Sequence, residues 1–213
     1  SLAFERPPAI GMDPSFAALL EARERRAHLA LVCASATEMP FRDGAIGGIV
    51  CNSVLEHIPD LDDALLECRR ALQPHGRLVV TSPSERFGAM LLGARVFASL
   101  GLPRAAAGYA RWFNAHSLHY HTLPMEEWLR RLNVAGFRVR ERWHYLGQAA
   151  HATFDLMHYV SGWRWIRRKL TGRWCGSWAP FNPIWTPWFT RLTKDSWPSG
   201  NGPYLYLNAE RKD

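Results

Sequence analysis

Residues 49–60 read I-V-C-N-S-V-L-E-H-I-P-D. The apolar run that ends in this stretch, 48–51, is short and lacks polar alternation, which is typical of a strand buried on both faces of a parallel sheet. Polar side chains follow at once, from Asn52 to His57. In open α/β sheets, ligands bind beyond the carboxyl ends of the strands, so the stretch predicts both a fold class and the place of a site.

Before and after this stretch, strand-like segments alternate with helix-like segments. The expected elements are strands at 9–12, 29–33 and 77–81, and a helix at 15–28. A further helix starts near Asp60, because acidic residues occupy its first turn and Arg69 and Arg70 its last, in agreement with the helix dipole. Strands that alternate with helices predict a parallel sheet flanked by helices, which is an α/β fold.

The second half of the chain has a looser rhythm. The expected elements there are helices around 89–100 and at 125–135, and alternating strands at 137–145 and 204–209. Most of the tryptophans fall between these last two strands. We therefore divide the chain into a core at 1–145, a helical insertion rich in Trp and Arg at 146–202, which forms a lid or an interface, and the last strand of the core sheet at 203–213.

Charge is distributed unevenly along the chain. Residues 1–83 carry 8 basic and 11 acidic side chains, a net charge of −3, whereas residues 84–213 carry 18 and 8, a net charge of +10. The second half is therefore the part expected to meet an anionic partner.

The cysteines and the apolar runs restrict the compartment. The 4 cysteines form no C-x-x-C pair, and a chain of 213 residues needs no disulfide to fold, so a reducing, cytoplasmic location is expected. The longest apolar run, 89–102, contains Arg95 and is shorter than the roughly 20 residues of a membrane span. Neither a spanning helix nor a secretory signal is expected.

Four segments in register carry a family resemblance. They are A-I-G-M-D-P-S (9–15), A-T-E-M-P-F-R-D-G (36–44), the stretch at 49–60, and A-L-Q-P-H-G-R-L-V-V-T-S-P (71–83). Together they resemble the class I S-adenosylmethionine-dependent methyltransferases of the small-molecule type, and residues 119–137 resemble the helix and strand that end that fold. The resemblance implies a Rossmann-like sheet, mostly parallel with an antiparallel last strand, with helices on both faces.

The resemblance also implies a cofactor and a reaction. S-adenosyl-L-methionine would be the methyl donor, and the acceptor would be an O, N or C nucleophile of a small-molecule or lipid-linked compound. Because the donor is already activated, alignment would supply most of the catalysis, with a base needed for a poorly acidic acceptor. The alternative is a catalytically inactive member of the fold that serves as a binding scaffold, with a peripheral membrane contact.

The resemblance assigns cofactor contacts to the ends of the first strands. Asp13 would accept from both ribose hydroxyls; the alternative is that it only caps the helix that begins at Pro14. Ser35 and Ala36 would lie at the adenine edge, where relatives usually have an acid before the Ala, so the neutral hydroxyl would hold the base less tightly. Gly47 stands where the family commonly has an Asp before the next strand.

The segment from Asn52 to His57 would line the junction of donor and acceptor. Asn52, Ser53 and Val54 are assigned to the cofactor, and His57 is the candidate general base, since imidazole titrates near neutral pH. The alternative is that His57 only orients a loop. Ubiquinone-type O-methyltransferases carry E-x-x-E-H here, but position 53 is Ser, so no metal is expected.

Three further histidines, His116, His119 and His121, precede the helix at 125–135. Their spacing, without a nearby Cys or carboxylate, fits no common zinc site, so no metal is expected there either. His119 and Tyr120 are instead candidates for the acceptor pocket, and a purely structural role is the alternative.

The glycine-rich loop that follows the first strand in this family is not found in the sequence. Residues 1–8 resemble the segment just after it, so the first, central strand of the sheet is expected to be absent from this chain. Two explanations stay open, a longer natural protein and a truncated form. In either case the strands at 9–12 and 48–51 would have unpaired inner edges.

The basic, aromatic segment 151–178 predicts an amphipathic helix. One face of this helix would carry apolar and aromatic side chains, Tyr159, Trp163, Ile166 and Leu170. A neighbouring face would carry Arg164, Arg167 and Arg168. A lid over the acceptor pocket and an interfacial membrane helix both fit this pattern. Arg beside aromatics also suits single-stranded nucleic acid, but no binding module is present, so a nucleic-acid partner is not expected.

Overall fold

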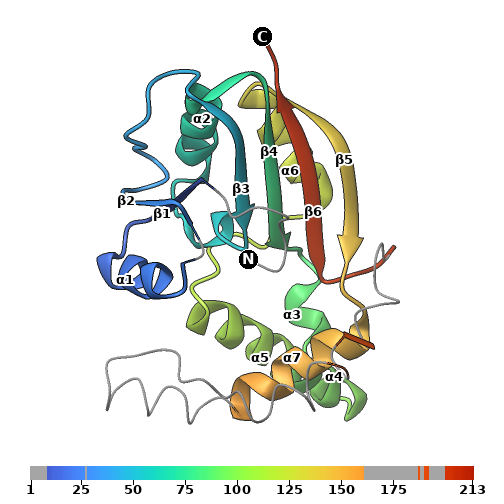
Figure 1. The fold of residues 1–213 in the computed structure, drawn as a ribbon. Helices are drawn as coiled ribbons and strands as arrows, with labels where there is room; N and C mark the ends of the chain where they lie inside the picture. Colours follow the sequence, from blue (N-terminus) through green and yellow to red (C-terminus); the bar gives the residue numbers. More distant parts are fainter. Residues whose placement is uncertain (1–8, 27, 161–186, 188–189, 192–199) are drawn as a thin grey trace.

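Two β-sheets organise the computed structural model, which describes residues 9–26, 28–160, 187, 190–191 and 200–213 (Figure 1). The strands are β1 (Ile10–Asp13), β2 (Ala30–Cys33), β3 (Ile46–Asn52), β4 (Leu72–Pro83), β5 (Phe137–Tyr145) and β6 (Tyr204–Arg211). The helices are α1 (Phe16–Glu24), α2 (Leu61–Ala71), α3 (Phe87–Met90), α4 (Leu92–Ser99), α5 (Pro103–His116), α6 (Met125–Val134) and α7 (Gln148–Val160), and a 3-10 turn, η1, spans Leu55–His57.

The strand order separates a small sheet from a larger one. β1 and β2 pair in parallel, whereas the larger sheet has the order β3-β4-β6-β5. β3 and β4 are parallel, and β6 runs antiparallel between β4 and β5. The predicted α/β class, with an antiparallel last strand at the end of the chain, is confirmed.

The inner edges of the two sheets are not paired with each other among the described residues. β1 ends the small sheet and β3 ends the large one, as expected from the sequence. Val50, in the middle of β3, is 52% exposed, and Ile10 of β1 is 39% exposed. Apolar side chains at this inner edge therefore retain contact with solvent.

Helices α2 and α6 cover one face of the four-stranded sheet (Figure 1). The apolar stripe of α2 is buried as its sequence pattern predicts, and α6 adds Trp128 and Leu132. These side chains pack against Leu78 and Val80 of β4 and against β6. This is the main hydrophobic core, and it holds the strands whose ends carry the candidate site.

Helices α3, α4, α5 and α7 lie beyond the carboxyl ends of β3 and β4 (Figure 1). They share a second apolar cluster around Phe87 and Phe113. Asp155 of α7 is buried and accepts from the Tyr109 hydroxyl at 2.8 Å and from the Gly93 amide at 3.0 Å, so it ties three of these helices together.

Several predicted bounds need correction. α1 begins at Phe16 with Ser15 as its cap, and it ends before Arg26, whose left-handed φ of 51° is incompatible with continuing the helix. β4 begins directly after α2, so the turn residues at 74–76 lie within an irregular strand start. Helix α5 was not predicted, because its Ala-rich sequence after Pro103 gives little periodic signal; Pro in the first turn starts it.

The predicted insertion at 146–202 falls only partly within the structure. Helix α7 begins it and includes Tyr159, whereas the rest of the amphipathic pattern, from Trp163 to Leu170 with its three arginines, lies outside the described residues. Among the helices that the structure describes, none combines the length and the apolar character needed to cross a membrane.

Candidate functional site

The carboxyl ends of β3 and β4 are joined by side-chain hydrogen bonds. The Thr81 hydroxyl donates to Asn52 Oδ1 at 2.6 Å and lies 3.0 Å from the Ser53 amide, which donates to it. Ser53 then takes a left-handed φ of 50°. This sharp turn ends the strand and directs η1 across the sheet edge, where the polar segment was predicted to line a cleft.

Asp13 lies at the carboxyl end of β1, as predicted. Its Oδ1 accepts from the Ser15 amide at 2.7 Å, while the helix cap itself is Ser15, whose hydroxyl accepts from Ala18 at 3.3 Å. The interpretation of Asp13 as the cap of a helix beginning at Pro14 is therefore wrong. The bond to Ser15 engages one carboxylate oxygen and leaves the other outside that bond.

Ser35 and Ala36 follow the end of β2. The Ser35 hydroxyl lies 2.7 Å from the Thr37 hydroxyl and accepts from the Thr37 amide at 3.2 Å, so it is engaged in a local turn. Ala36 packs against the main core. The structure therefore shows Ser35 holding its own loop, and its predicted contact with adenine stays a prediction.

Glu56, His57 and His119 form a cluster that joins two segments distant in sequence. The backbone carbonyl of Glu56 accepts from the amides of Tyr120 at 2.8 Å and His121 at 3.3 Å. The rings of His57 and His119 are 5.2 Å apart between centroids. The loop after α5 is thus docked on η1, and the predicted candidates His57 and His119 are brought together.

The protonation of His57 follows from its partner. Its Nδ1 lies 3.1 Å from the carbonyl oxygen of Leu118, which can only accept, so Nδ1 carries the proton. The lone pair is then on Nε2, 4.0 Å from Glu56 Oε1. The side chain is 41% exposed. His57 therefore presents its Nε2 on a side chain that solvent can reach.

Glu56 is a carboxyl group almost out of contact with water. Its side chain is 1% exposed, and its Oε2 has no hydrogen-bond partner among the described residues. Burial raises the pKa of Glu56, although the positive charge of a protonated His57 and a hydrogen bond with Ser53 oppose the rise. A group of this kind favours the protonated form more than a surface glutamate does.

His119 is held neutral by its surroundings. Its Nδ1 lies 3.3 Å from Asn114 Oδ1, and Phe87 packs edge-on against its ring at 5.1 Å. Burial, with a smaller contribution from the charge of His57, lowers the pKa of His119 to about 4. The imidazole is therefore a hydrogen-bonding group rather than a cation at neutral pH.

The same three groups offer a carboxylate and two imidazoles, which zinc and iron accept as donors. One ligand atom of each lies within 4.8 Å of the other two. Ligands bound to one ion at about 2.1 Å lie only ~3.3 Å apart, whereas His57 Nε2 and Glu56 Oε1 are 4.0 Å apart. The cluster is wider than a coordination shell, and the absence of a metal stays a prediction.

The three histidines near residue 120 have separate partners. His116 stacks on Trp112 at 5.5 Å, and His121 Nε2 lies 3.0 Å from the carbonyl oxygen of Ile58. Tyr120 is 57% exposed, at the outer side of the loop. Of the three residues predicted for the acceptor pocket, His57 and His119 thus belong to the cluster, and Tyr120 contributes its backbone amide.

Two tyrosines at the site escaped prediction. Tyr145 ends β5 and Tyr204 begins β6, and the two are paired opposite each other. Burial raises the pKa of Tyr145, and it raises the pKa of Tyr204 as well; the charge of Glu56 adds to both shifts. Each alternating strand has a tyrosine at the end nearest the helices, which was the available signal.

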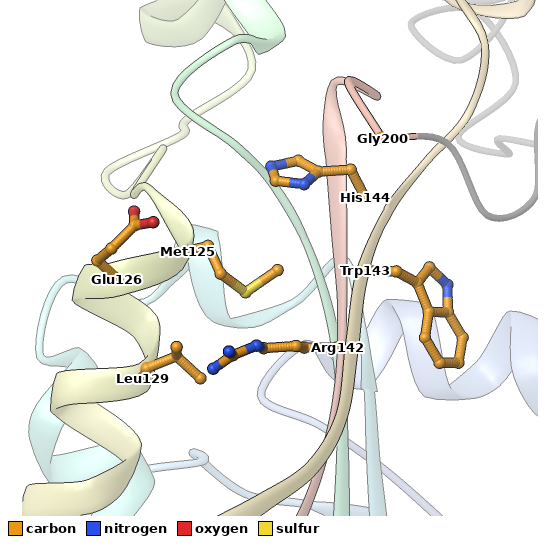
Figure 2. A pocket seen from close by; sticks show the side chains of 7 residues that line it. All are labelled: Met125, Glu126, Leu129, Arg142, Trp143, His144 and Gly200. Carbon is orange, nitrogen blue, oxygen red and sulfur yellow. The ribbon is translucent and has the colours of Figure 1, made fainter.

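A separate hollow of about 540 Å³ lies between α6 and β5 (Figure 2). Its lining residues are Met125, Glu126, Leu129, Arg142, Trp143, His144 and Gly200. Arg142 and His144 point toward α6, while Trp143 points to the opposite face of the strand (Figure 2). Because β5 is the strand farthest from β3, this hollow is distinct from the cluster around Glu56.

Known proteins resemble this chain in both sequence and structure. Residues 3–80 match the family model of a methyltransferase domain. The chain is 29% identical over 150 residues to a demethylmenaquinone methyltransferase of Beutenbergia cavernae, a match that covers 68% of this chain and 60% of that protein. The chain is thus similar in sequence to methyltransferases, as the resemblance of its four segments implied.

Two further similarities define how far the match extends. The chain is 38% identical over 77 residues to an uncharacterized transposon protein of Streptomyces fradiae, covering 35% of the chain and 22% of that protein. It also shares its fold, with a TM-score of 0.52 and 17% identity, with a geranyl diphosphate C-methyltransferase of Streptomyces coelicolor, covering 96% of the chain and 63% of that structure. The chain thus spans 22% and 60% of the lengths of the two curated relatives.

Proposed function

We propose that the chain transfers a methyl group from S-adenosylmethionine to an O, N or C atom of a small-molecule or lipid-linked acceptor. The observation that carries this proposal is the cluster of Glu56, His57 and His119 at the carboxyl end of β3, the edge where ligands of α/β sheets bind. The names of two relatives, which include demethylmenaquinone and geranyl diphosphate, support an acceptor of this class.

The ends of β1, β2 and β3 supply the groups that would hold the cofactor. Asp13 retains a carboxylate oxygen outside its bond to Ser15 and would accept from the ribose hydroxyls. Ser35 and Ala36 would border the adenine, and Asn52, Ser53 and Val54 would lie against the rest of the cofactor. When bound, S-adenosylmethionine supplies a methyl group on a sulfonium, which the acceptor takes with release of a neutral thioether.

His57 would remove the proton of an acidic acceptor. Its Nε2 carries the lone pair, because Leu118 fixes the proton on Nδ1, and its exposed side chain is reachable from solvent. His119, neutral and held by Asn114, would orient the acceptor by a hydrogen bond. Alignment of the two reactants supplies most of the rate enhancement in such a transfer, and the base contributes when the acceptor is weakly acidic.

Calorimetric titration with S-adenosylmethionine tests the cofactor assignment. Asp13→Asn is expected to raise the Kd by about 10- to 100-fold, because it removes hydrogen bonds to a charged acceptor. Asp63→Asn, an exposed acid of α2, is the matched control and should bind as the parent does. Absence of binding to the parent chain, or equal binding by Asp13→Asn, would contradict the proposal and favour a binding scaffold that has lost the cofactor.

A methyl-transfer assay with a demethylated quinol and a prenyl diphosphate tests the base. His57→Gln should lower kcat by about 10²- to 10⁴-fold for an acceptor that must lose a proton, while the Kd for S-adenosylmethionine stays unchanged. His75→Gln, at the exposed far end of β4, is the control. Undiminished turnover by His57→Gln would show that this imidazole only orients its loop.

A further inference from the structure

Helices α4 and α5 pack side by side and meet in an exposed apolar turn (Figure 1). Leu100 is 66% exposed, Leu102 is 49% exposed, and Val96, one turn before Leu100 on α4, is 47% exposed. Gly101 has a φ of +73°, which permits the tight connection between the helices. We call Val96, Leu100 and Leu102 the hairpin tip.

The hairpin lies in a segment without any acidic residue. From Arg86 to Met125 the chain has four arginines and neither Asp nor Glu. On α5, Arg104 and Arg111 are two turns apart, so they share one face, and both are exposed. Within the part of the chain that the structure describes, neither forms an ion pair with a carboxylate. This face of α5 is therefore strongly cationic.

An aromatic ring adjoins the cationic face. Trp112 follows Arg111, is 49% exposed, and stacks on the ring of His116. Trp and Arg beside exposed aliphatic side chains are the combination found where proteins contact the interface of a bilayer, with the aliphatic groups among the acyl chains and the cations at the phosphates. An exposed leucine on its own does not indicate a membrane contact: Leu66 of α2 is 53% exposed, with two acids one turn before it and two arginines one turn after it.

The exposure of the tip is not a result of loose packing. Asp155 of α7 is buried and bonded to Gly93 of α4 and to Tyr109 of α5. Ala94 of α4 and Phe113 of α5 are buried in the second apolar cluster. The hairpin is thus held firmly from its inner side, so that its exposed apolar and basic side chains are carried on a packed support.

We propose that the hairpin tip and the basic face of α5 dock on an anionic lipid bilayer. Val96, Leu100 and Leu102 would enter the boundary between headgroups and acyl chains, Arg104 and Arg111 would contact lipid phosphates, and Trp112 would lie at headgroup level. The last turn of α5 carries Asn114, the partner of His119, so one helix connects this surface with the cluster around Glu56. The docking does not depend on the proposed methyl transfer.

Co-sedimentation with vesicles tests the proposal without any measurement of activity. The whole chain should sediment with vesicles of phosphatidylglycerol and phosphatidylcholine and not with phosphatidylcholine alone, and added salt should release it. Leu100→Asp/Leu102→Asp and Arg104→Glu/Arg111→Glu should each lower the partition coefficient at least about tenfold. Leu66→Asp, at a similarly exposed leucine outside the hairpin, should partition as the parent does.

Each remaining outcome overturns the docking. The proposal is wrong if the parent chain fails to sediment with anionic vesicles at low salt. It is also wrong if both double variants, shown to be folded by circular dichroism, sediment as the parent does. A third outcome is that the arginine variant loses vesicle binding while the leucine variant keeps it, and that the parent binds heparin as tightly as it binds vesicles. The surface then binds soluble polyanions and does not dock on a bilayer. Methyl transfer can fail in the assay above without changing any of these results.

Discussion

The two sheets of this protein differ in how much structure supports them. In the four-stranded sheet, Leu78, Leu205 and Leu207 are fully buried under α2 and α6. In the pair of β1 and β2, each four residues long, Gly11 is the one buried residue, and α1 buries only Leu19 against it. A two-stranded unit has little stability of its own. The proposed acceptor side of the site is therefore supported by a packed core, whereas the proposed cofactor side is supported by few buried contacts.

This difference concerns function because the proposed ligand would bridge the two sheets. Asp13 belongs to the small sheet, and the segment from Asn52 to His57 belongs to the large one. Regions with few buried apolar contacts open more readily than the core of the same protein. A ligand that binds both sheets would stabilise the small one more than the large one.

The largest expected effect contrasts the same substitution in the two sheets. Leu78→Ala should lower the free energy of unfolding by about 2–5 kcal/mol, because it leaves a cavity in a closed core. Leu31→Ala in β2, which is only half-buried, should lower it by about 1 kcal/mol or less. Urea titration followed by circular dichroism measures both. Equal losses would mean that the two sheets share one core after all.

A smaller effect concerns acid. His119 has a pKa of about 4 in the folded chain, against about 6.5 when unfolded, so between these values the unfolded state binds the proton first. Stability present above about pH 6.5 is then lost as the pH falls toward 4, by about 1–2 kcal/mol once solvent screening of this half-buried ring is allowed for. Urea titrations at several pH values should show a flatter profile for His119→Gln. A profile identical to the parent's would contradict the assignment.

The smallest effect is expected from charged side chains that meet near the end of β6, between β4 and β5. Glu210 accepts from Arg140 at 2.9 and 3.1 Å, and Arg77 and His75 lie nearby, which lowers the pKa of Glu210 to about 2. Solvent screens this cluster, so Glu210→Gln should change Tm by no more than about 2 °C at physiological salt. A shift in Tm of more than about 5 °C would contradict this prediction and would show that these charges contribute substantially to stability.

The sequence was a good guide where local pattern and tertiary packing agree. In α2, acidic residues in the first turn, arginines in the last and apolar residues at steps of 4, 3 and 4 gave the helix and its buried face. In α5 the local pattern is weak, because alanine occurs on every face, and the helix was missed. Its packing comes from Phe113 and Tyr109, whose partners on α3, α4 and α7 are far away in sequence.

The candidate site shows the same division. Asp13 and His57 could be named from the strand ends that precede them. Tyr145 and Tyr204 could not, because they reach the site from strands that join the sheet only after long intervening segments. His119 was predicted for the acceptor pocket, but its contact with His57 could not be predicted, since that contact depends on a loop that docks on the backbone carbonyl of Glu56.

The sequence alone determined the fold class, the resemblance to methyltransferases and the strand ends at which polar groups gather, because hydrophobic periodicity and helix signals act over a few neighbouring residues. Tertiary structure decided which of those groups meet. It buried Glu56, placed the Leu118 carbonyl against Nδ1 of His57, kept His119 neutral and left apolar and basic side chains of a helical hairpin exposed. These properties depend on burial and on hydrogen-bond partners tens of residues away, which no local pattern encodes.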